Sequence, residues 1–353
     1  MLLSLPVDVI CEAIFAYLSF GDIKRLDIAF TNRDLRPELC GIWQRYCTKN
    51  LRHIYGKHVY ITMVGRDVVE ITIDEDGELD LQQLTERFRC CPRLRKLYVD
   101  LSSKVILTED TLFDLARHCP HLEVLSMVNT EHRCADDGLI AVAQHCHKLH
   151  TIELHSNITD SVIQALCDYC PHLRHIDLLL CFQLTDKSLI AIANAYPHLK
   201  SLSLNALEFS GSAIETLADK CHELEKVILY AVSYHKHSFA KLWKANPKIL
   251  SFGLCSSTFT DDFVVSFAQS CHKVRVVHLG QCRGITDVSL IALGQHCHEL
   301  QDLSLKHTDT KGITEAGVEA LVAGCPWLYY FSTRDRRLKA SFERLSLKGQ
   351  ISN

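Results

Sequence analysis

The sequence has no apolar run approaching the roughly 20 residues that a membrane-spanning helix needs. Its 353 residues carry a formal net charge of only -4, which gives no reason to expect nucleic acid or an acidic lipid surface as a partner. The apolar N-terminus lacks the basic stretch of a secretory signal, and Asp8 and Glu12 interrupt it. We therefore expect no membrane association and a cytoplasmic or nuclear protein.

Sequence motifs of common enzyme classes are also missing. The chain has no GxxxxGK(S/T) phosphate loop, no GxGxxG after a strand, no GxSxG nucleophile elbow and no HExxH. Acids, histidines and cysteines are plentiful, but a repeating sequence scatters such residues periodically, and no water-excluding pocket with a nucleophile is readable. We therefore predict a protein without catalytic residues, and without a cofactor.

One unit recurs through most of the chain. Its anchor is usually a cysteine followed by proline or histidine, with leucine or another aliphatic residue three positions later, and successive anchors lie 24 to 28 residues apart. Self-similarity at this period is typical of a leucine-rich-repeat solenoid. The anchors are Cys91, Cys119, Cys146, Cys170, Tyr196, Cys221, Asn246, Cys271, Cys297 and Cys325.

Each unit divides into a strand and a helix. Leu300, Leu303 and Leu305 show the pattern that follows an anchor, and its alternation with polar residues predicts a half-buried strand. A pair such as Thr185-Asp186 then predicts a helix start, because threonine is a good N-cap and aspartate in the first turn favours the helix dipole. We predict an α/β leucine-rich-repeat solenoid, with a curved parallel sheet on the concave side and helices on the convex side. Each unit buries its apolar face against a neighbouring copy.

The cysteines and their flanking histidines need a separate explanation. Seventeen cysteines in a chain without a secretory signal favour reduced, buried thiols over disulfides. His145-Cys146-His147 and His296-Cys297-His298 look like metal ligands, but zinc ligands usually come in spaced pairs that converge on one ion. The cysteine recurs at the same place in most units, so we interpret it as a packed thiol. We predict solvent-facing histidines and no metal site.

The first fifty residues follow a different pattern, with a Leu-Pro pair ahead of three short stretches that we read as helices. Helices this few and short make a marginal core. Spaced aliphatic residues follow the Leu-Pro pair, and the pattern includes Leu5, Pro6, Ile10, Ile14, Leu18 and Leu26. With this pattern the segment resembles the F-box, and its Ile42-Trp43 pair is similar to the Leu-Trp pair near the end of that motif. The repeats resemble the cysteine-containing leucine-rich-repeat class that commonly follows an F-box.

The resemblance implies a substrate-recognition subunit of a Skp–cullin–F-box type ubiquitin ligase. The six F-box residues would bind a Skp-type adaptor on a cullin scaffold, and the repeats would hold a target protein. We expect a small three-helix F-box-like domain at residues 1–50, and a linker with a degenerate first repeat at 51–90. Repeats of about 26 residues follow at 91–335, with a C-terminal cap or tail at 336–353.

The concave face is the expected target-binding surface, because these folds use their long curved sheet for binding. Alternation along each strand places every second residue on that face. Near the C-terminal end, Tyr330 and Arg334 add aromatic and arginine side chains, which are over-represented in binding hot spots. The predicted target-binding residues are Tyr98, Glu153, His155, His175, Asp177, Ile228, Tyr230, His278, Tyr330 and Arg334.

Two other interpretations remain open from the sequence. The N-terminal helices could merely cap the first repeat, as solenoids require, in a non-enzymatic interaction scaffold without a role in ubiquitin transfer. An exposed face carrying Leu5, Ile10, Ile14 and Leu18 would favour adaptor binding, and a face buried against the first repeat would favour the cap. The basic stretch from Arg334 to Lys348 could also contact nucleic acid, which would predict strongly salt-sensitive binding.

Overall fold

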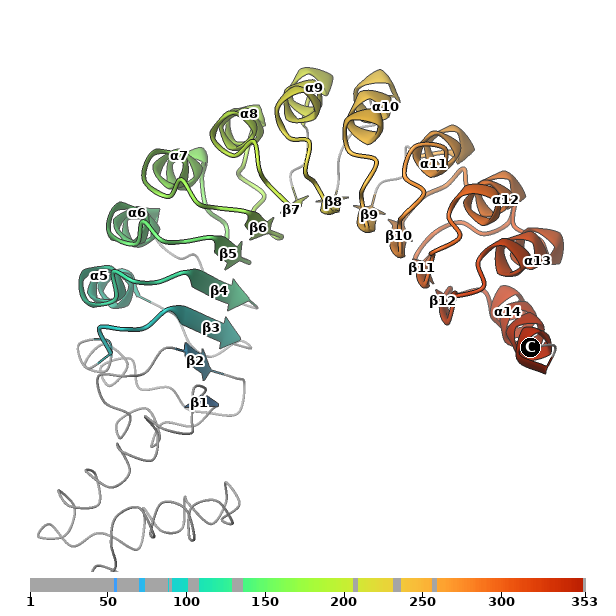
Figure 1. Cartoon of the computed structure of the whole chain (residues 1–353), viewed down its shortest axis with the longest axis horizontal. Coiled ribbons are helices and arrows are strands. Elements are labelled where there is room, and N and C mark those ends of the chain that lie inside the picture. Colours follow the sequence, from blue (N-terminus) through green and yellow to red (C-terminus); the bar gives the residue numbers. More distant parts are fainter. Residues whose placement is uncertain are drawn as a thin grey trace, which may run out of the picture. The chain divides into compact units, whose positions relative to one another are not determined.

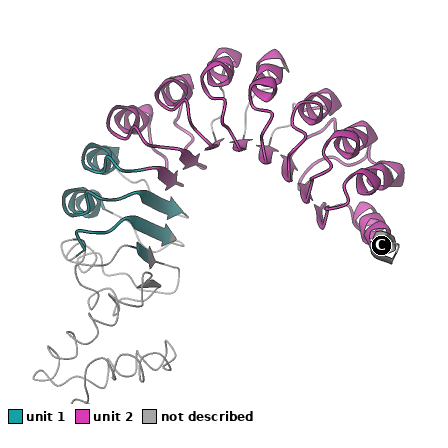
Figure 2. Ribbon diagram, in the orientation of Figure 1, with its two compact units in different colours: residues 1–149 teal, residues 150–353 magenta. Residues whose placement is uncertain are grey.

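A computed structural model describes residues 54–55, 70–73, 88, 91–100, 108–128, 136–205, 209–230, 236–255 and 259–351. The chain divides into two compact units, residues 1–149 and residues 150–353 (Figure 2). Each unit is described by itself. The F-box-like residues Leu5 to Leu26 lie outside the described residues.

The first unit contains parallel strands joined by helices. Its ladder runs in chain order, with Glu70 opposite Lys96 and Lys96 opposite Val124. The described elements are β1 (Ile54–Tyr55), β2 (Glu70–Ile73), β3 (Lys96–Asp100), α5 (Glu109–His118), β4 (Val124–Val128) and α6 (Asp136–His145).

The second unit repeats a strand and a helix along its length. Its strands pair in parallel with their neighbours in the sequence. The elements are β5 (Thr151–Leu154), α7 (Asp160–Tyr169), β6 (His175–Leu178), α8 (Asp186–Ala195), β7 (Ser201–Asn205), α9 (Gly211–Lys220), β8 (Lys226–Tyr230), α10 (Lys236–Ala245), β9 (Ser251–Cys255), α11 (Asp261–Ala268), β10 (Val276–Gly280), α12 (Asp287–His296), β11 (Asp302–Ser304), α13 (Glu315–Gly324), β12 (Tyr330–Ser332) and α14 (Arg336–Ile351).

Within the second unit the strands lie on the inner side of an arc and the helices on its outer side (Figure 1). The predicted leucine-rich-repeat solenoid is therefore confirmed. The core between the two layers is built from the repeat leucines, for example Leu202, Leu204 and Leu303, each fully buried. None of the helices in the described part of the chain is long and apolar enough to cross a bilayer.

The anchor residues connect consecutive units through hydrogen bonds. The Cys325 thiol donates to the Cys297 carbonyl at 3.3 Å, and the Cys221 thiol donates to the Tyr196 carbonyl at 3.4 Å. Asn246 preserves this bond where cysteine is absent, because its Nδ2 donates to the Cys221 carbonyl at 2.9 Å. The anchor is therefore a buried donor that satisfies a carbonyl of the preceding unit, in addition to filling space.

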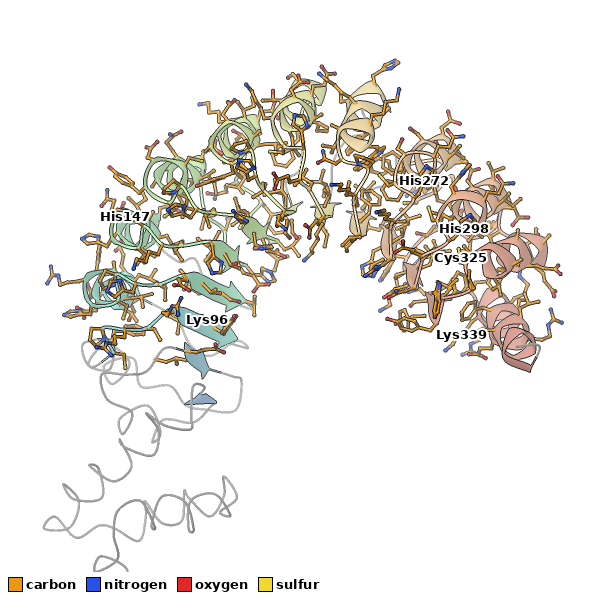
Figure 3. The ribbon with its side chains drawn as sticks, in the orientation of Figure 1. Lys96, His147, His272, His298, Cys325 and Lys339 are labelled. Carbon is orange, nitrogen blue, oxygen red and sulfur yellow. The ribbon has the colours of Figure 1, made fainter. Side chains whose placement is uncertain are left out.

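Burial keeps these thiols protonated. It raises the pKa of Cys221, Cys271 and Cys297 to about 12, and for Cys297 the neighbouring thiols of Cys325 and Cys271 add to the effect. All cysteines in the described part are free thiols. Histidines beside the anchors, such as His272 and His298, are exposed (Figure 3), as predicted.

The Thr-Asp pairs also link consecutive units. In α8 the N-cap Thr185 accepts a hydrogen bond from the Lys187 amide, which is the predicted capping role. Thr185 also donates its backbone N–H and its hydroxyl to Asp160 of the preceding helix, at 2.9 and 2.6 Å. Asp287 accepts the corresponding pair from Thr314, at 2.7 and 2.6 Å. Each such aspartate therefore holds the helix start of the following unit.

Candidate functional site

The candidate site is the concave face of the second unit's sheet. Consecutive strands pair with equivalent positions opposite one another, so side chains on this face form columns that run across the strands. One column reads Thr151, His175, Ser201, Lys226, Ser251, Val276, Asp302 and Tyr330. The next column reads Glu153, Asp177, Ser203, Ile228, Gly253, His278, Ser304 and Ser332.

The predicted target-binding residues are spread over both units. Tyr98, opposite Thr72 and Ser126, lies in the first unit and is half-buried. The side chain of Tyr230 lies outside the described part of the structure. The remaining predicted residues belong to the second unit. They gather in two regions, one around Asp177 and one over β9 to β12, with Ile228 between them. Their binding role stays a prediction.

Asp177 is the centre of the first region. Its carboxylate lies 3.6 Å from His155 Nε2 and 3.5 Å from Lys226 Nζ. Burial by itself would raise the pKa of Asp177, but the neighbouring polar side chains of His155 and Ser203 and the Lys226 charge lower it below its ordinary value. Asp177 is therefore an ionised group that already has a partner on β8, two strands away, and another just after β5, on the adjacent strand.

In the column that contains Asp177, a large side chain at Ile228 is followed by glycine at position 253 on the next strand. Ile228 lies over Gly253 of the adjacent strand, and a Cβ at position 253 would come within 3.3 Å of the Ile228 side chain. Glycine therefore lets Ile228 lie across the sheet. This half-buried isoleucine offers apolar contact between the Asp177 region and the second region.

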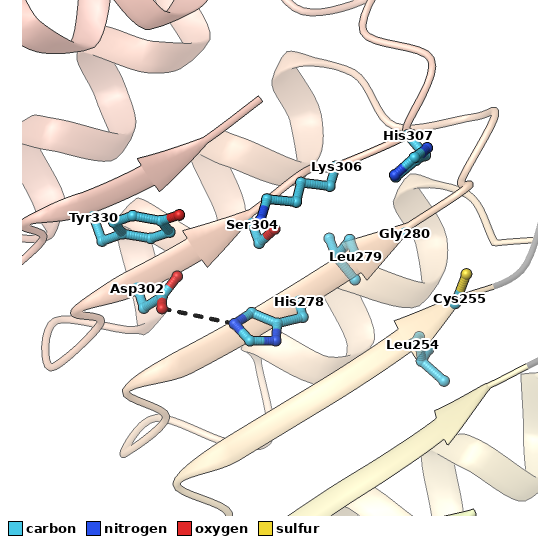
Figure 4. A pocket seen from close by; sticks show the side chains of 10 residues that line it. All are labelled: Leu254, Cys255, His278, Leu279, Gly280, Asp302, Ser304, Lys306, His307 and Tyr330. Carbon is cyan, nitrogen blue, oxygen red and sulfur yellow. Dashed lines mark ion pairs between the residues drawn. The ribbon is translucent and has the colours of Figure 1, made fainter. Parts of the chain in front are cut away.

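The second region is a pocket of about 470 Å³ over β9 to β12, within the size range of ligand sites (Figure 4). The pocket is open because several of the residues that line it, Cys255, Gly280 and Ser304, have small side chains. A Cβ at Gly280 would lie 3.1 Å from the Cys255 sulfur, so a larger residue at 280 would crowd that side of the pocket. The lining residues are Leu254, Cys255, His278, Leu279, Gly280, Asp302, Ser304, Lys306, His307 and Tyr330.

Charged groups are unevenly placed in this pocket. His278 Nε2 lies 3.7 Å from a carboxylate oxygen of Asp302 on the next strand. At the other end of β11, the backbone of His307 is left-handed, with φ 65°, and its Nε2 lies 3.3 Å from Arg334. Lys306 precedes it and is exposed. The pocket therefore has an acid near the start of β11 and basic groups beyond its end.

Strand alternation also places Asp302, Lys306, Gly280 and Cys255 on the concave face, although they are not among the predicted target-binding residues. His307 was not identified from the sequence. A signal was present, since positions that carry large side chains in some units carry glycine, serine or cysteine in β9 to β11. The sequence did not show that these small residues form one hollow across β9 to β11. It also did not show the left-handed backbone at His307.

The chemistry of the pocket suits binding. Burial raises the pKa of the Cys255 thiol, so this sulfur is not the thiolate that a cysteine nucleophile requires. No group of three histidine, cysteine or acidic side chains within the described ranges converges in the manner of a metal site. The pocket offers one carboxylate, basic groups and an aromatic ring to a polar ligand.

Comparison with known proteins confirms the family resemblance. The chain is 20% identical over 263 residues to GRR1-like protein 1 of Arabidopsis thaliana, covering 72% of this chain but 40% of that protein. It is 28% identical over 207 residues to putative F-box/LRR-repeat protein 21 of the same plant, covering 43% of this chain and 68% of the relative. The chain therefore spans less than half the length of the first relative. No protein-family model matches it.

A solved structure supports the fold. A chain in the crystal structure of the yeast Rad7 and Elc1 complex superposes with a TM-score of 0.50 at 15% identity. The match covers 85% of this chain and 96% of the yeast chain. At this identity the similarity establishes the fold alone.

Proposed function

We propose that this chain is the substrate-recognition subunit of a Skp–cullin–F-box type ubiquitin ligase. The proposal rests on the similarity to an F-box/LRR-repeat protein taken together with the fold of the repeats. The curated relatives include a putative F-box/LRR-repeat protein, and the repeats form a solenoid with an open polar face. The chain would bring a target to the ligase without performing chemistry itself, and it would act in the cytoplasm or nucleus.

The target would bind on the concave face. Glu153, His155, His175, Asp177 and Ile228 form one part of the proposed surface. His278, Tyr330 and Arg334 form another, around the pocket of the second unit. Tyr98 and Tyr230 complete the proposed set. A surface of this kind provides apolar contact at Ile228 and charged contacts around it, as partner-binding surfaces do.

The adaptor would bind residues 1–50 through Leu5, Pro6, Ile10, Ile14, Leu18 and Leu26. This part of the proposal rests on the sequence resemblance. Residues 51–90 would join the segment to the repeats at 91–335, and residues 336–353 would close the solenoid. The Skp-type adaptor would in turn connect the chain to a cullin scaffold.

Co-expression of the intact chain with a Skp-type adaptor, followed by gel filtration, tests adaptor binding. A variant with Leu5, Ile10 and Ile14 each changed to aspartate should lose co-elution, while Ile228→Asp on the concave face should retain it. The matched variant separates loss of the adaptor surface from a general effect of added charge. If the folded intact chain fails to co-elute, the ligase proposal is wrong.

The second candidate function is a non-enzymatic repeat scaffold whose N-terminal helices act only as a cap. It follows from the fold alone, since a solenoid needs its terminal repeats covered. Under this alternative the three aspartate substitutions should unfold the first repeats, and no adaptor should bind either chain. Near-native melting of the triple variant, together with loss of adaptor, would favour the ligase proposal.

A further inference from the structure

Two cations occupy equivalent positions at the basic end of the pocket in the second unit. Ser304 of β11 lies opposite Ser332 of β12, and Lys306 and Arg334 each follow two residues later in their own units. Both are exposed, and neither pairs with a carboxylate in the described part of the chain. Like charges at equivalent positions of adjacent strands repel each other. This end of the pocket therefore has positive charge that no acid offsets.

The acids close to these cations in the sequence are engaged elsewhere. Asp309 lies 4.0 Å from Lys311 Nζ, and Asp335 accepts hydrogen bonds from the first turn of α14. Asp302 lines the pocket, but one of its oxygens is buried and the other faces His278 Nε2 at 3.7 Å. The groups that the pocket leaves available to a ligand are therefore mainly hydrogen-bond donors.

These donors border a hollow. Cys255 and Gly280 precede Lys306 in the same column of the sheet, and their small side chains leave room beside the lysine. Ser304 also lines the hollow, and its hydroxyl has no hydrogen bond to another residue in the described ranges. Figure 4 shows Ser304, Lys306 and His307 following one another along the end of β11. A single exposed ion pair is weak, but an anion in this hollow would meet several donors at once.

The contact between Arg334 and His307 fixes how much charge the site carries. Arginine has donors and no acceptor, so His307 Nε2 accepts in their 3.3 Å contact and its ring is neutral there. The site therefore supplies two positive charges, from Lys306 and Arg334. Asp302 in the same pocket repels a phosphate dianion more strongly than a carboxylate with one charge. This balance of charge favours a carboxylate as the ligand.

We propose that the pocket over β9 to β12 binds the side-chain carboxylate of an aspartate or glutamate of the target protein. Lys306 and Arg334 pair with the carboxylate, and the Ser304 hydroxyl donates to it. The guanidinium of Arg334 can present two parallel donors to such a planar group. The inference rests on the proposed function, since it names the chemistry of the target that the concave face would hold.

The test uses three small probes with the full-length chain at low ionic strength, where ion pairs are least screened. N-acetyl-glutamic acid α-amide carries one side-chain carboxylate, and N-acetyl-glutamine amide has nearly the same shape without the charge. Ligand-detected NMR titration should show saturable binding of the glutamate probe and binding at least about tenfold weaker for the glutamine probe. N-acetyl-phosphoserine amide should bind no more tightly than the glutamate probe.

Substitutions locate the binding site. Lys306→Gln and Arg334→Gln should each weaken the glutamate probe by at least about threefold. Lys311→Gln is the matched control, because this lysine is almost fully exposed and does not line the pocket. It removes the same charge from the neighbouring turn and should leave the affinity unchanged. Thermal melting verifies that each variant is folded.

Four results would overturn the proposal. Equal binding of the glutamate and glutamine probes, or no binding of the glutamate probe up to its solubility limit, would show that no carboxylate site exists. Unchanged affinity in Lys306→Gln and Arg334→Gln would place binding elsewhere on the chain. Tighter binding of the phosphoserine probe would show that the site selects a phosphate instead.

The result is separable from that of the adaptor test. If the adaptor co-elutes but the glutamate probe does not bind, the ligase role survives and the carboxylate site is wrong. If the probe binds through Lys306 and no adaptor co-elutes, the site stands and the chain is a scaffold outside the ligase.

Discussion

The carboxylate of Asp261, in the first turn of α11, accepts a hydrogen bond from the Thr286 hydroxyl at 2.6 Å and another from the Thr286 backbone N–H at 2.9 Å. Ser289, one turn further along the next helix, donates its own N–H and hydroxyl to the same carboxylate. One aspartate thereby satisfies backbone donors at the start of the following helix, which have no partner within that helix. The repeated Thr-Asp pair in the sequence reflects this contact.

Asp261→Ala should lower the free energy of unfolding by about 2 kcal/mol, because it removes charge-assisted hydrogen bonds to two residues of the next unit. Urea denaturation measures the change. Asp219→Ala is the matched control, since Asp219 forms an exposed ion pair with Lys241. Such pairs contribute little, so the control should change stability by less than about 0.5 kcal/mol. Equal effects of the two substitutions would contradict this role of Asp261.

Asn246 provides a second test of the contacts between units. It donates to the Cys221 carbonyl and accepts from the Leu224 N–H at 3.0 Å, and it is almost wholly buried. Asn246→Leu leaves both backbone groups unpaired and should destabilise the chain by about 2 to 4 kcal/mol. Asn246→Cys restores the donor of the other units and should recover part of the loss. Identical destabilisation by leucine and cysteine would show that the donor is unimportant.

Asp177 should make stability depend on pH. Although burial opposes it, the neighbouring polar side chains of His155 and Ser203 and the charge of Lys226 hold the folded-state pKa below the ordinary value of 3.8. A lowered carboxyl pKa adds stability above the unfolded-state pKa, and this is lost as the pH falls through the folded-state pKa. Asp177→Asn should therefore cost about 1 to 2 kcal/mol at neutral pH, and the difference should shrink below about pH 4.

The measurement is urea denaturation of both proteins over a range of pH values. A difference between Asp177→Asn and the unchanged chain that stays constant down to acid pH would show that the carboxylate charge is not what stabilises this region.

The anchor thiols should resist alkylation in the folded chain. A pKa of about 12 at Cys221, Cys271 and Cys297 leaves almost no thiolate at neutral pH, and burial blocks access. Iodoacetamide treatment followed by peptide mass spectrometry should find these residues unmodified in the native chain and modified after unfolding in urea. Rapid modification of the native chain at these sites would contradict the burial described.

The repeat period and the strand alternation made the fold predictable. Both are local patterns, and they fix which residues face inward, so the pairing of Asp177 with Ser203 or of Ile228 with Gly253 follows from aligning the units. The role of Asn246 was harder to predict. From the sequence, asparagine at an anchor position indicates only that the thiol is absent. The structure shows that its side chain donates to the same kind of carbonyl, that of Cys221.

The candidate site was only partly predictable, because strand alternation identifies which residues face the concave side but not the shape of that surface. Alternation identified His278, Tyr330 and Arg334 as residues of the concave face. It could not identify the pocket, which depends on the absence of a side chain at Gly280 and on the left-handed turn at His307. Nor does alternation show that the Lys226 side chain, two strands away, reaches Asp177.

We propose that this chain selects proteins for ubiquitin transfer, and quantitative proteomics of ubiquitin-modified peptides can test that role in cells. Cells would express the intact chain, the Leu5/Ile10/Ile14 aspartate variant, or Ile228→Asp, each at a matched level. The account predicts a set of proteins whose ubiquitin modification rises with the intact chain and with neither variant, since one variant loses the adaptor and the other the target. Modification that is the same in all three would contradict it.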